Sequence, residues 1–278
     1  MRLVWQLVTV AAVAFLGGQG LMAADGEPWV MLPAGLATAA LALLVYGAVV
    51  RRTERRTVTE LSREGAGVAV GWGTALGVAL FGLVVVNLYF LGYYDVDGLG
   101  SRSEAAGLVG FMAAAAVTEE LLFRGVLFRI IEERTGAWTA MVLTGVLFGV
   151  YHLANPDASL WGAVAIAVEA GGMLTAAYLA TRRLWVPIGL HFGWNFAAAG
   201  IFSTAVSGNG DNTGLLDATT SGPALVTGGD FGPEASPYSV VFCLLATAGF
   251  LWLARRRGHV RPRRRKAAPV DALTTLSR

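Results

Sequence analysis

Two adjacent carboxylates and an arginine lie inside an apolar segment of this 278-residue chain. The segment, TEELLFRG at residues 118–125, follows an alanine-rich run and leads into a run rich in aliphatic residues. A charged side chain at the centre of a membrane helix costs about 3 kcal/mol on insertion scales, and such residues usually serve a function. Glu119, Glu120 and Arg124 are therefore the first candidates for chemistry.

Helix geometry separates the two carboxylates. Successive residues of an α-helix lie about 100° apart around its axis. Glu120 and Arg124 therefore share a face at i, i+4, with the acid on the N-terminal side, which favours an ion pair. Glu119 points about 100° away from Glu120, so Arg124 can neutralise Glu120 and leave Glu119 free. The alternative is a structural ion pair that joins two helices, with Glu119 protonated by desolvation.

Two histidines and an asparagine in later apolar segments could complete a site. The sequence FGVYH places Phe148 and His152 on one helical face, and HFGWN does the same for His191 and Asn195. The alternative for each histidine is a hydrogen bond that joins membrane helices. The third histidine of the chain, His259, lies in an arginine-rich stretch and is expected to be solvated.

This set of side chains suits hydrolysis by an activated water molecule. A carboxylate can accept a proton from water, a histidine can orient the water, and His and Asn donors can stabilise an oxyanion. Serine and cysteine lack an evident neighbouring base, which disfavours a covalent nucleophile. Zinc with Glu119, His152 and His191 as ligands is chemically possible. However, the spacing H-E-x-x-H is absent, and Glu120 would then have to act as base, so metal-free activation is favoured.

The composition indicates a membrane protein. Hydrophobic residues make up 55% of the chain and charged residues 14%, with a mean hydropathy of +0.59, whereas soluble domains are about 25% charged. Continuous apolar runs, long enough at about 20 residues to cross a bilayer, predict helices rather than alternating strands. We predict an all-α polytopic membrane bundle with about eight transmembrane helices. They span residues 3–23, 29–50, 67–93, 105–131, 138–154, 161–181, 184–203 and 238–254.

Arginine residues mark one side of the predicted bundle. They follow the second, fourth, sixth and eighth runs, and short cytoplasmic loops are enriched in Lys and Arg. The loops on the opposite side contain a single basic residue, Arg102. We predict a multi-pass cell-membrane protein with both termini cytoplasmic. An alternative for the first run is a cleaved signal peptide. The basic segments are residues 51–56, 132–136, 182–184 and 255–266, and the opposite loops are residues 24–28, 94–104, 155–160 and 204–237.

Four regions follow from this pattern. Residues 1–66 form two helices and a basic loop, 67–203 a catalytic core, 204–237 a flexible external loop, and 238–278 the last helix with a basic tail. The tail is expected to lie near anionic lipid, and it lacks the interleaved aromatic residues of a nucleic-acid-binding segment. The arginine-rich, lysine-poor composition indicates a bacterial source.

Two further residues lie in the apolar runs. Cys243 is the single cysteine of the chain, which excludes a disulfide framework. Glu169 is either a structural hydrogen-bonding group or part of a cavity wall.

The three polar segments resemble the motifs of a known family. EELLFRG, FGVYH and GLHFGWN, in this order on successive membrane helices, are similar to the motifs of the CPBP intramembrane proteases, also called the CAAX-protease or Abi family. The resemblance covers about residues 105–200. It implies cleavage of a peptide bond within or at the edge of the membrane, with Glu119 activating water and His152 assisting. His191 and Asn195 would hold the oxyanion.

The same resemblance implies supporting roles for the remaining motif residues. Glu120 and Arg124 would support the site, and Phe148 would pack beside His152 without reacting. The protein is thus expected to be an intramembrane endopeptidase of the CAAX-protease-like type, and a metalloprotease if zinc is bound.

Other functional classes remain possible on the sequence alone. Glu119 and the histidines could form the relay of a proton-coupled transporter, or the chain could be a catalytically silent immunity or scaffold protein. The internal repeat that many transporters show is not visible. The expected substrate is a peptide or a membrane protein. In a bacterium, bacteriocin-like peptides or membrane-protein tails are more plausible than a prenylated C-terminus.

Overall fold

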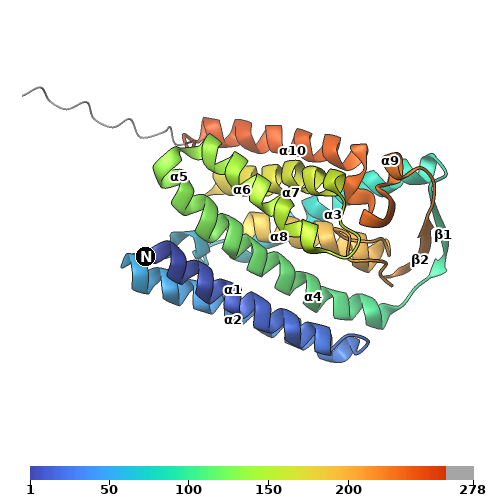
Figure 1. The fold of residues 1–278 in the computed structure, drawn as a ribbon, viewed down its shortest axis with the longest axis horizontal. Coiled ribbons are helices and arrows are strands. Elements are labelled where there is room, and N and C mark those ends of the chain that lie inside the picture. The colour runs from blue at the N-terminus through green and yellow to red at the C-terminus, as the bar shows by residue number, and fades with distance from the viewer. Residues whose placement is uncertain (261–278) are drawn as a thin grey trace, which may run out of the picture.

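The computed structural model describes residues 1–260, and most of them belong to helices packed side by side (Figure 1). The predicted all-α polytopic bundle is confirmed. A π-helical segment, Leu121–Phe128, joins α4 to α5, so that Arg102–Thr135 is one continuous helix. Most of the predicted basic tail, from residue 261 onward, lies outside the described residues. The long helices are α1 (Arg2–Ala23), α2 (Pro28–Glu54), α3 (Ala66–Phe90), α4 (Arg102–Glu120), α5 (Arg129–Thr135), α6 (Ala137–Tyr151), α7 (Leu160–Thr181), α8 (Trp185–Phe196) and α10 (Pro237–Arg256).

Seven of the described helices are long and apolar enough to cross a membrane. The run predicted at 184–203 differs, because α8 has 12 residues and continues as a 5-residue π-helical segment, Ala197–Ile201. Most of α8 is buried. The motif residues His191 and Asn195 therefore lie on a helix that is enclosed by protein.

Glycine allows α8 to lie very close to α3. A Cβ atom added at Gly193 of α8 would be 2.2 Å from the Thr74 carbonyl oxygen, and one at Gly77 of α3 would be 2.3 Å from the Leu190 carbonyl oxygen. Real Cβ atoms do not approach other atoms so closely, so these backbones touch only because both positions lack side chains. Small residues commonly permit such close contacts between membrane helices.

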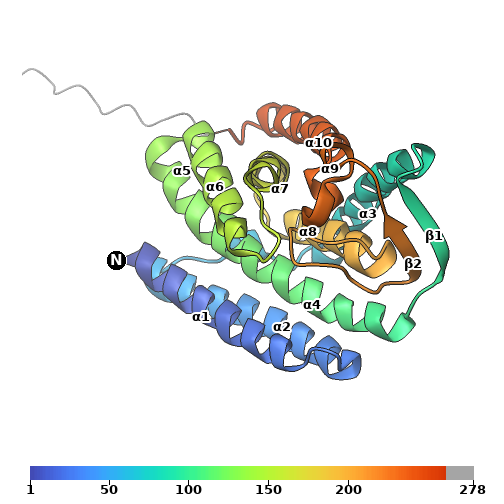
Figure 2. The ribbon, with the colours of Figure 1, turned by 45° about the vertical axis from the view of Figure 1, so that its right-hand side comes forward.

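The central helix of the bundle is α7. It packs against α6, α8 and α10, and Figure 2 shows it nearly end-on between them. Gly145 of α6 and Gly171 of α7 face each other, since a Cβ atom at Gly171 would lie 2.7 Å from the Gly145 Cα atom. Most of the C-terminal half of α7 is buried. Glu169, near the middle of α7, is also buried and is therefore held within the protein, away from lipid.

The segment 204–237 is more ordered than the flexible external loop that we expected. It contains β2 (Leu216–Thr220), α9 (Ala224–Thr227) and two short 3₁₀ turns. Strand β2 pairs in antiparallel fashion with β1 (Tyr94–Leu99), at one end of the bundle (Figure 1). Part of the segment folds inward, so that Phe231 and Glu234 are buried.

Ion pairs join the predicted basic segments at the other end of the bundle. Arg129 pairs with Glu54 at 2.8 Å, and Arg182 forms two hydrogen bonds to Glu132, at 2.6 and 2.8 Å. Arg56 and Glu60 form a further pair at 2.7 Å. The N-terminus and the C-terminal end of α10 both lie at this end (Figure 1). The basic segments therefore share one end, as predicted, while the side of the membrane on which they lie stays a prediction.

The carboxyl group of Glu60 shows why this end is held together. Burial alone would raise its pKa, but hydrogen bonds from Arg56 and from the Tyr46 hydroxyl more than compensate and lower the pKa below its ordinary value. An ionised Glu60 therefore anchors the loop that follows α2.

His259 is not the solvated residue that we expected. Its Nδ1 atom lies 3.1 Å from the carbonyl oxygens of both Leu179 and Ala180, in the last turn of α7. The last carbonyl groups of a helix lack backbone partners, and His259 provides a donor for them. The chain that follows α10 is thus attached to the end of α7.

The membrane orientation can be tested by labelling single cysteines in a Cys243→Ser background. Thr213→Cys and Thr57→Cys replace exposed residues at opposite ends of the bundle. We expect a membrane-impermeant thiol reagent to label the first variant in intact cells, and to label the second only after the cells are opened. The reason is the enrichment of arginine in cytoplasmic loops. The reverse pattern would show that the predicted orientation is wrong.

Candidate active site

The first motif lies where α4 changes into a π-helix. Glu119 and Glu120 end α4, and Arg124 lies within the π-helical segment Leu121–Phe128. The wider helical turn leaves backbone groups to be paired by side chains, and the Gly125 carbonyl accepts hydrogen bonds from Arg129 at 2.8 Å and from the Tyr46 hydroxyl at 3.0 Å. Such π-helical turns occur frequently at functional sites.

Arg124 forms the predicted ion pair with Glu120. The distance between Nη1 of Arg124 and Oε1 of Glu120 is 2.6 Å, and both side chains are almost completely buried. The guanidinium also donates to the Ala170 carbonyl at 2.5 Å and lies 4.8 Å from the centre of the Phe148 ring. Arg124 therefore ties the first motif to α7 and to the second motif at once.

His191 faces both carboxylates of the first motif. Its Nδ1 atom lies 2.9 Å from Oε1 of Glu120, and its Nε2 atom lies 3.8 Å from Oε2 of Glu119. A carboxylate can only accept a hydrogen bond, so the Nδ1 atom donates to Glu120. Glu120 thus receives hydrogen bonds from Arg124 and His191 together. The contact between Glu120 and His191 joins residues 71 positions apart, so helical spacing did not predict it.

Glu119 is the carboxylate without a strong partner. Its Oε2 atom has no hydrogen-bond partner among residues 1–260, and the side chain is 17% exposed. The distance of 3.8 Å to His191 is too long for a direct hydrogen bond, and a separation of this size between polar atoms fits a bridging water. Glu119 therefore has a free acceptor atom beside a histidine.

The second motif ends α6 and places Phe148 close to both histidines. His152 lies in a 3₁₀ turn, His152–Ala154, where its Nδ1 atom is 2.8 Å from the Phe148 carbonyl oxygen. The Phe148 ring lies 4.7 Å from the His152 ring and 6.2 Å from the His191 ring, measured between centroids. Phe148 thus packs beside His152, and its ring also lies near His191.

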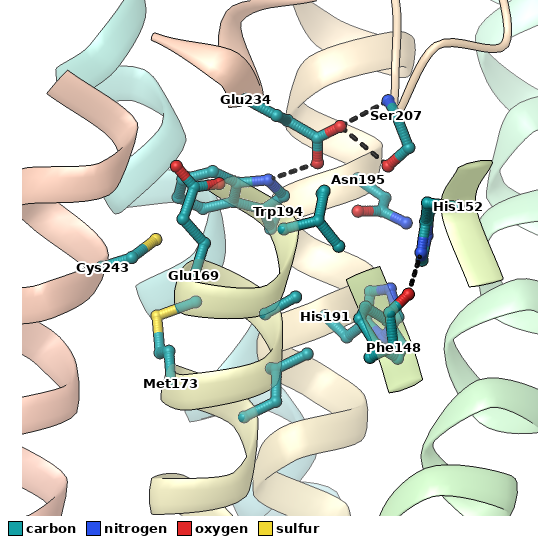
Figure 3. A pocket seen from close by; sticks show the side chains of 13 residues that line it. Phe148, His152, Glu169, Met173, His191, Trp194, Asn195, Ser207, Glu234 and Cys243 are labelled. Atoms are coloured by element: carbon teal, nitrogen blue, oxygen red, sulfur yellow. Dashed lines mark hydrogen bonds between the residues drawn. The ribbon is translucent and has the colours of Figure 1, made fainter. Parts of the chain in front are cut away.

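His152, His191 and Asn195 line one cavity (Figure 3). The empty space within the cavity, including space open to the outside, is about 350 Å³. Glu119 reaches the same region through its contact with His191. The structure thus brings the residues of the three motifs together. The polar part of the cavity wall consists of His152, Glu169, His191, Asn195, Ser207 and Glu234.

Three cavity residues carry functional groups that the sequence did not assign to a site. Glu169, for which two roles were open, lies on the cavity wall and is buried. Glu234 and Ser207 come from the segment 204–237, where no motif drew attention to them. Glu234 accepts hydrogen bonds from Trp194 Nε1 at 2.8 Å and from the backbone and hydroxyl groups of Ser207 at 2.5 and 2.9 Å. These bonds fasten the segment 204–237 over the cavity.

The zinc ligand set considered from the sequence is not assembled in this arrangement. A zinc ion needs three or four ligand atoms around one point. Within residues 1–260, no group of three His, Cys, Asp or Glu side chains is placed to hold one metal ion. Glu119, His152 and His191 are neighbours without converging as ligands, and we derive no reaction step through a metal.

Comparisons with known proteins agree with the motifs. The family model described as Rce1-like, type II CAAX prenyl endopeptidase, matches residues 101–197, which contain all three motifs. A Bacillus subtilis (strain 168) protein named "Putative membrane peptidase YdiL" is 26% identical over 166 aligned positions, and the match covers 55% of this chain and 64% of that relative. The chain thus spans less than two thirds of the relative's length. No solved structure matches the chain. The resemblance to the CAAX-protease family is confirmed.

The ion pair between Glu120 and Arg124 is expected to contribute strongly to the stability of the folded protein. Arg124→Ala leaves Glu120 buried with only His191 to compensate it, and breaking a buried pair in this way costs about 3–5 kcal/mol. We expect a clearly lower melting temperature for the purified variant. The double variant Arg124→Ala with Glu120→Gln removes the stranded charge and should recover part of the loss. An unchanged melting temperature in the single variant would show that the pair has no structural role.

Proposed function

We propose that the protein is an intramembrane endopeptidase that hydrolyses a peptide bond with a water molecule activated by Glu119. The observation that carries this proposal is the 3.8 Å separation between Oε2 of Glu119 and Nε2 of His191. His191 lines a cavity together with His152 and Asn195, and Glu119 lies next to His191. The family match and the membrane peptidase relative support the same class of reaction.

The geometry of His191 supports a water molecule between these two atoms. With the Nδ1 proton donated to Glu120, a singly protonated His191 carries a lone pair on Nε2. Glu119 also presents a lone pair to the gap. A water molecule there donates a hydrogen bond to each, and its own lone pairs are left to face the substrate carbonyl. In this state His191 orients the nucleophile, whereas an oxyanion-holding role would require a doubly protonated ring.

The reaction then proceeds by ordinary general base catalysis. Glu119 takes one proton from the water, and the water oxygen attacks the carbonyl carbon of the peptide bond. The amide group of Asn195 donates to the oxyanion that forms. The protonated Glu119 passes its proton to the departing amine nitrogen, which breaks the carbon–nitrogen bond and yields an acid and an amine. His152 keeps its Nε2 atom available to share the proton in transit.

Glu120 and Arg124 support this chemistry without taking part in it. Arg124 neutralises Glu120, so Glu120 is a permanent acceptor for the Nδ1 proton of His191. The imidazole is thereby held in one orientation and one tautomer, as is usual for histidines oriented by a carboxylate. The substrate class that fits a site at membrane depth is a peptide or a segment of a membrane protein.

Replacement of Glu119 tests the assignment of the base. Glu119→Gln keeps the size of the side chain but cannot accept a proton, so we expect peptide cleavage to fall at least about 100-fold, the lower range for loss of a general base. The melting temperature should change little, because Glu119 has no strong partner. Cleavage is measured with purified protein and a library of peptides and membrane-protein tails.

A matched control for this experiment is Glu64→Gln, at an exposed residue far from the motifs. This variant should retain full activity. Residual activity above about a tenth of wild type in Glu119→Gln contradicts the assignment, because a lost general base costs about 10²–10⁴-fold. Ion flux in vesicles without any cleavage product would indicate a transporter instead. Zinc bound at one ion per chain in active protein, and lost together with activity in His191→Ala, would contradict a metal-free reaction.

Asn195 provides an independent test of the proposed transition state. Asn195→Ala removes one donor to the oxyanion, and such a loss usually lowers kcat by about 10²–10³. We expect KM to change much less, because the donor acts mainly on the charge that develops during the reaction. If KM instead rose by a similar factor while kcat stayed unchanged, Asn195 would bind the substrate and would not stabilise the transition state.

A further inference from the structure

A buried carboxyl group in the cavity lacks any partner. Glu169 is 2% exposed, and neither of its oxygen atoms has a hydrogen-bond partner among the described residues. The Glu169 side chain forms part of the cavity wall. Buried polar groups are nearly always hydrogen-bonded because desolvation without a partner is costly. An acid kept unpartnered at membrane depth is expected to serve a function.

The second carboxyl group of the cavity wall, that of Glu234, differs from Glu169 because it is hydrogen-bonded. Glu234 accepts three hydrogen bonds, from Trp194 and Ser207, and so needs no further partner. Glu169 shares the cavity with it and has none. Figure 3 shows Glu169 near Trp194 and Cys243, on the side of the cavity away from His152. The cavity thus has a reactive end at the histidines and an acidic end at Glu169.

The charges around this acidic end favour a cation. The cavity wall contains two carboxyl groups and, among the described residues, neither lysine nor arginine. The nearby guanidinium of Arg124 is already used by Glu120 and by the Ala170 carbonyl. The apolar part of the cavity wall includes Ile166, Met173 and Leu174. Apolar walls with a carboxylate at the end match the methylene stem and charged head of a basic side chain.

We propose that Glu169 recognises an alkylammonium or guanidinium group, which in the substrate is a lysine or arginine side chain beside the scissile bond. The substrate part of this proposal rests on the proposed function. A cation in the cavity supplies the partner that Glu169 lacks. Glu169 is then a specificity-determining residue that takes no part in bond cleavage.

Cys243 offers a direct test that does not depend on peptide cleavage. It is the single cysteine of the chain and lines the acidic end of the cavity. We compare its labelling by 2-aminoethyl methanethiosulfonate, which carries an ammonium group, with labelling by the neutral ethyl methanethiosulfonate. Each rate is divided by the rate with free cysteine. An attraction between unit charges in a partly buried site predicts a preference of about tenfold for the cationic reagent.

Variants of the full-length protein locate the cause of this preference. Glu169→Gln should reduce the ratio toward one, whereas the control Glu64→Gln should leave it unchanged. The wild-type ratio is informative by itself, so the test survives if Glu169→Gln folds poorly. A wild-type ratio of about one, a ratio that Glu169→Gln leaves unchanged, or a Cys243 that neither reagent reaches would each overturn the proposal.

Cleavage of a peptide library tests the role of Glu169 in substrate recognition separately from the proposed peptidase activity. Wild-type protein should prefer peptides with lysine or arginine at one position near the cut, and Glu169→Gln should lose this preference while still cleaving peptides with glutamine there. Cleavage without any basic preference overturns the role of Glu169 and leaves the peptidase proposal standing. Cation-selective labelling of Cys243 without any cleavage keeps the cation site and overturns the peptidase proposal.

Discussion

The arrangement of the site depends on one buried carboxylate, that of Glu120. This group is completely buried and lies between the Arg124 guanidinium at 2.6 Å and the His191 imidazole at 2.9 Å. A buried charge is tolerated only when such partners compensate it. Removal of either partner would therefore disturb two helices at once. Glu120 fixes the orientation of His191, and through His191 it fixes the space that faces Glu119.

Backbone irregularity and small residues make this arrangement possible. The π-helical turn after Glu120 aims Arg124 at α7, while carbonyl groups freed by the wider turn are paired by Arg129 and Tyr46. Contact between the backbones of α3 and α8 depends on glycine at positions such as Gly193. Irregular backbone at membrane depth is tolerated where protein encloses it, and the burial of α8 meets that condition.

The cavity is completed from outside the motif region. The segment 204–237 is fastened by Glu234, which accepts hydrogen bonds from Trp194 and Ser207. Trp194 directly precedes Asn195, so the anchor of this segment and the proposed oxyanion donor share one turn of α8. The unpartnered Glu169 lines the same cavity from α7. The two acids therefore have different physical roles, since one carries a structural anchor and the other has no hydrogen-bond partner among the described residues.

The sequence by itself determined the properties that depend on neighbouring residues. Apolar runs of sufficient length predicted the helices, and the i, i+4 spacing predicted that Arg124 would pair with Glu120 and leave Glu119 free. Hydrophobicity and helical periodicity are local, so these features can be read without a fold. The order of the motifs also predicted which family the central region resembles.

Tertiary structure decided everything that depends on distances between helices. It placed His191 against Glu120, packed Phe148 near both histidines, and docked His259 on the end of α7. It also shortened α8, ordered the segment 204–237 and left Glu169 without a partner. These contacts join residues far apart in the chain, and they depend on how closely the helix backbones can approach one another. That approach is set by packing of all the helices together, which no single segment of the sequence specifies.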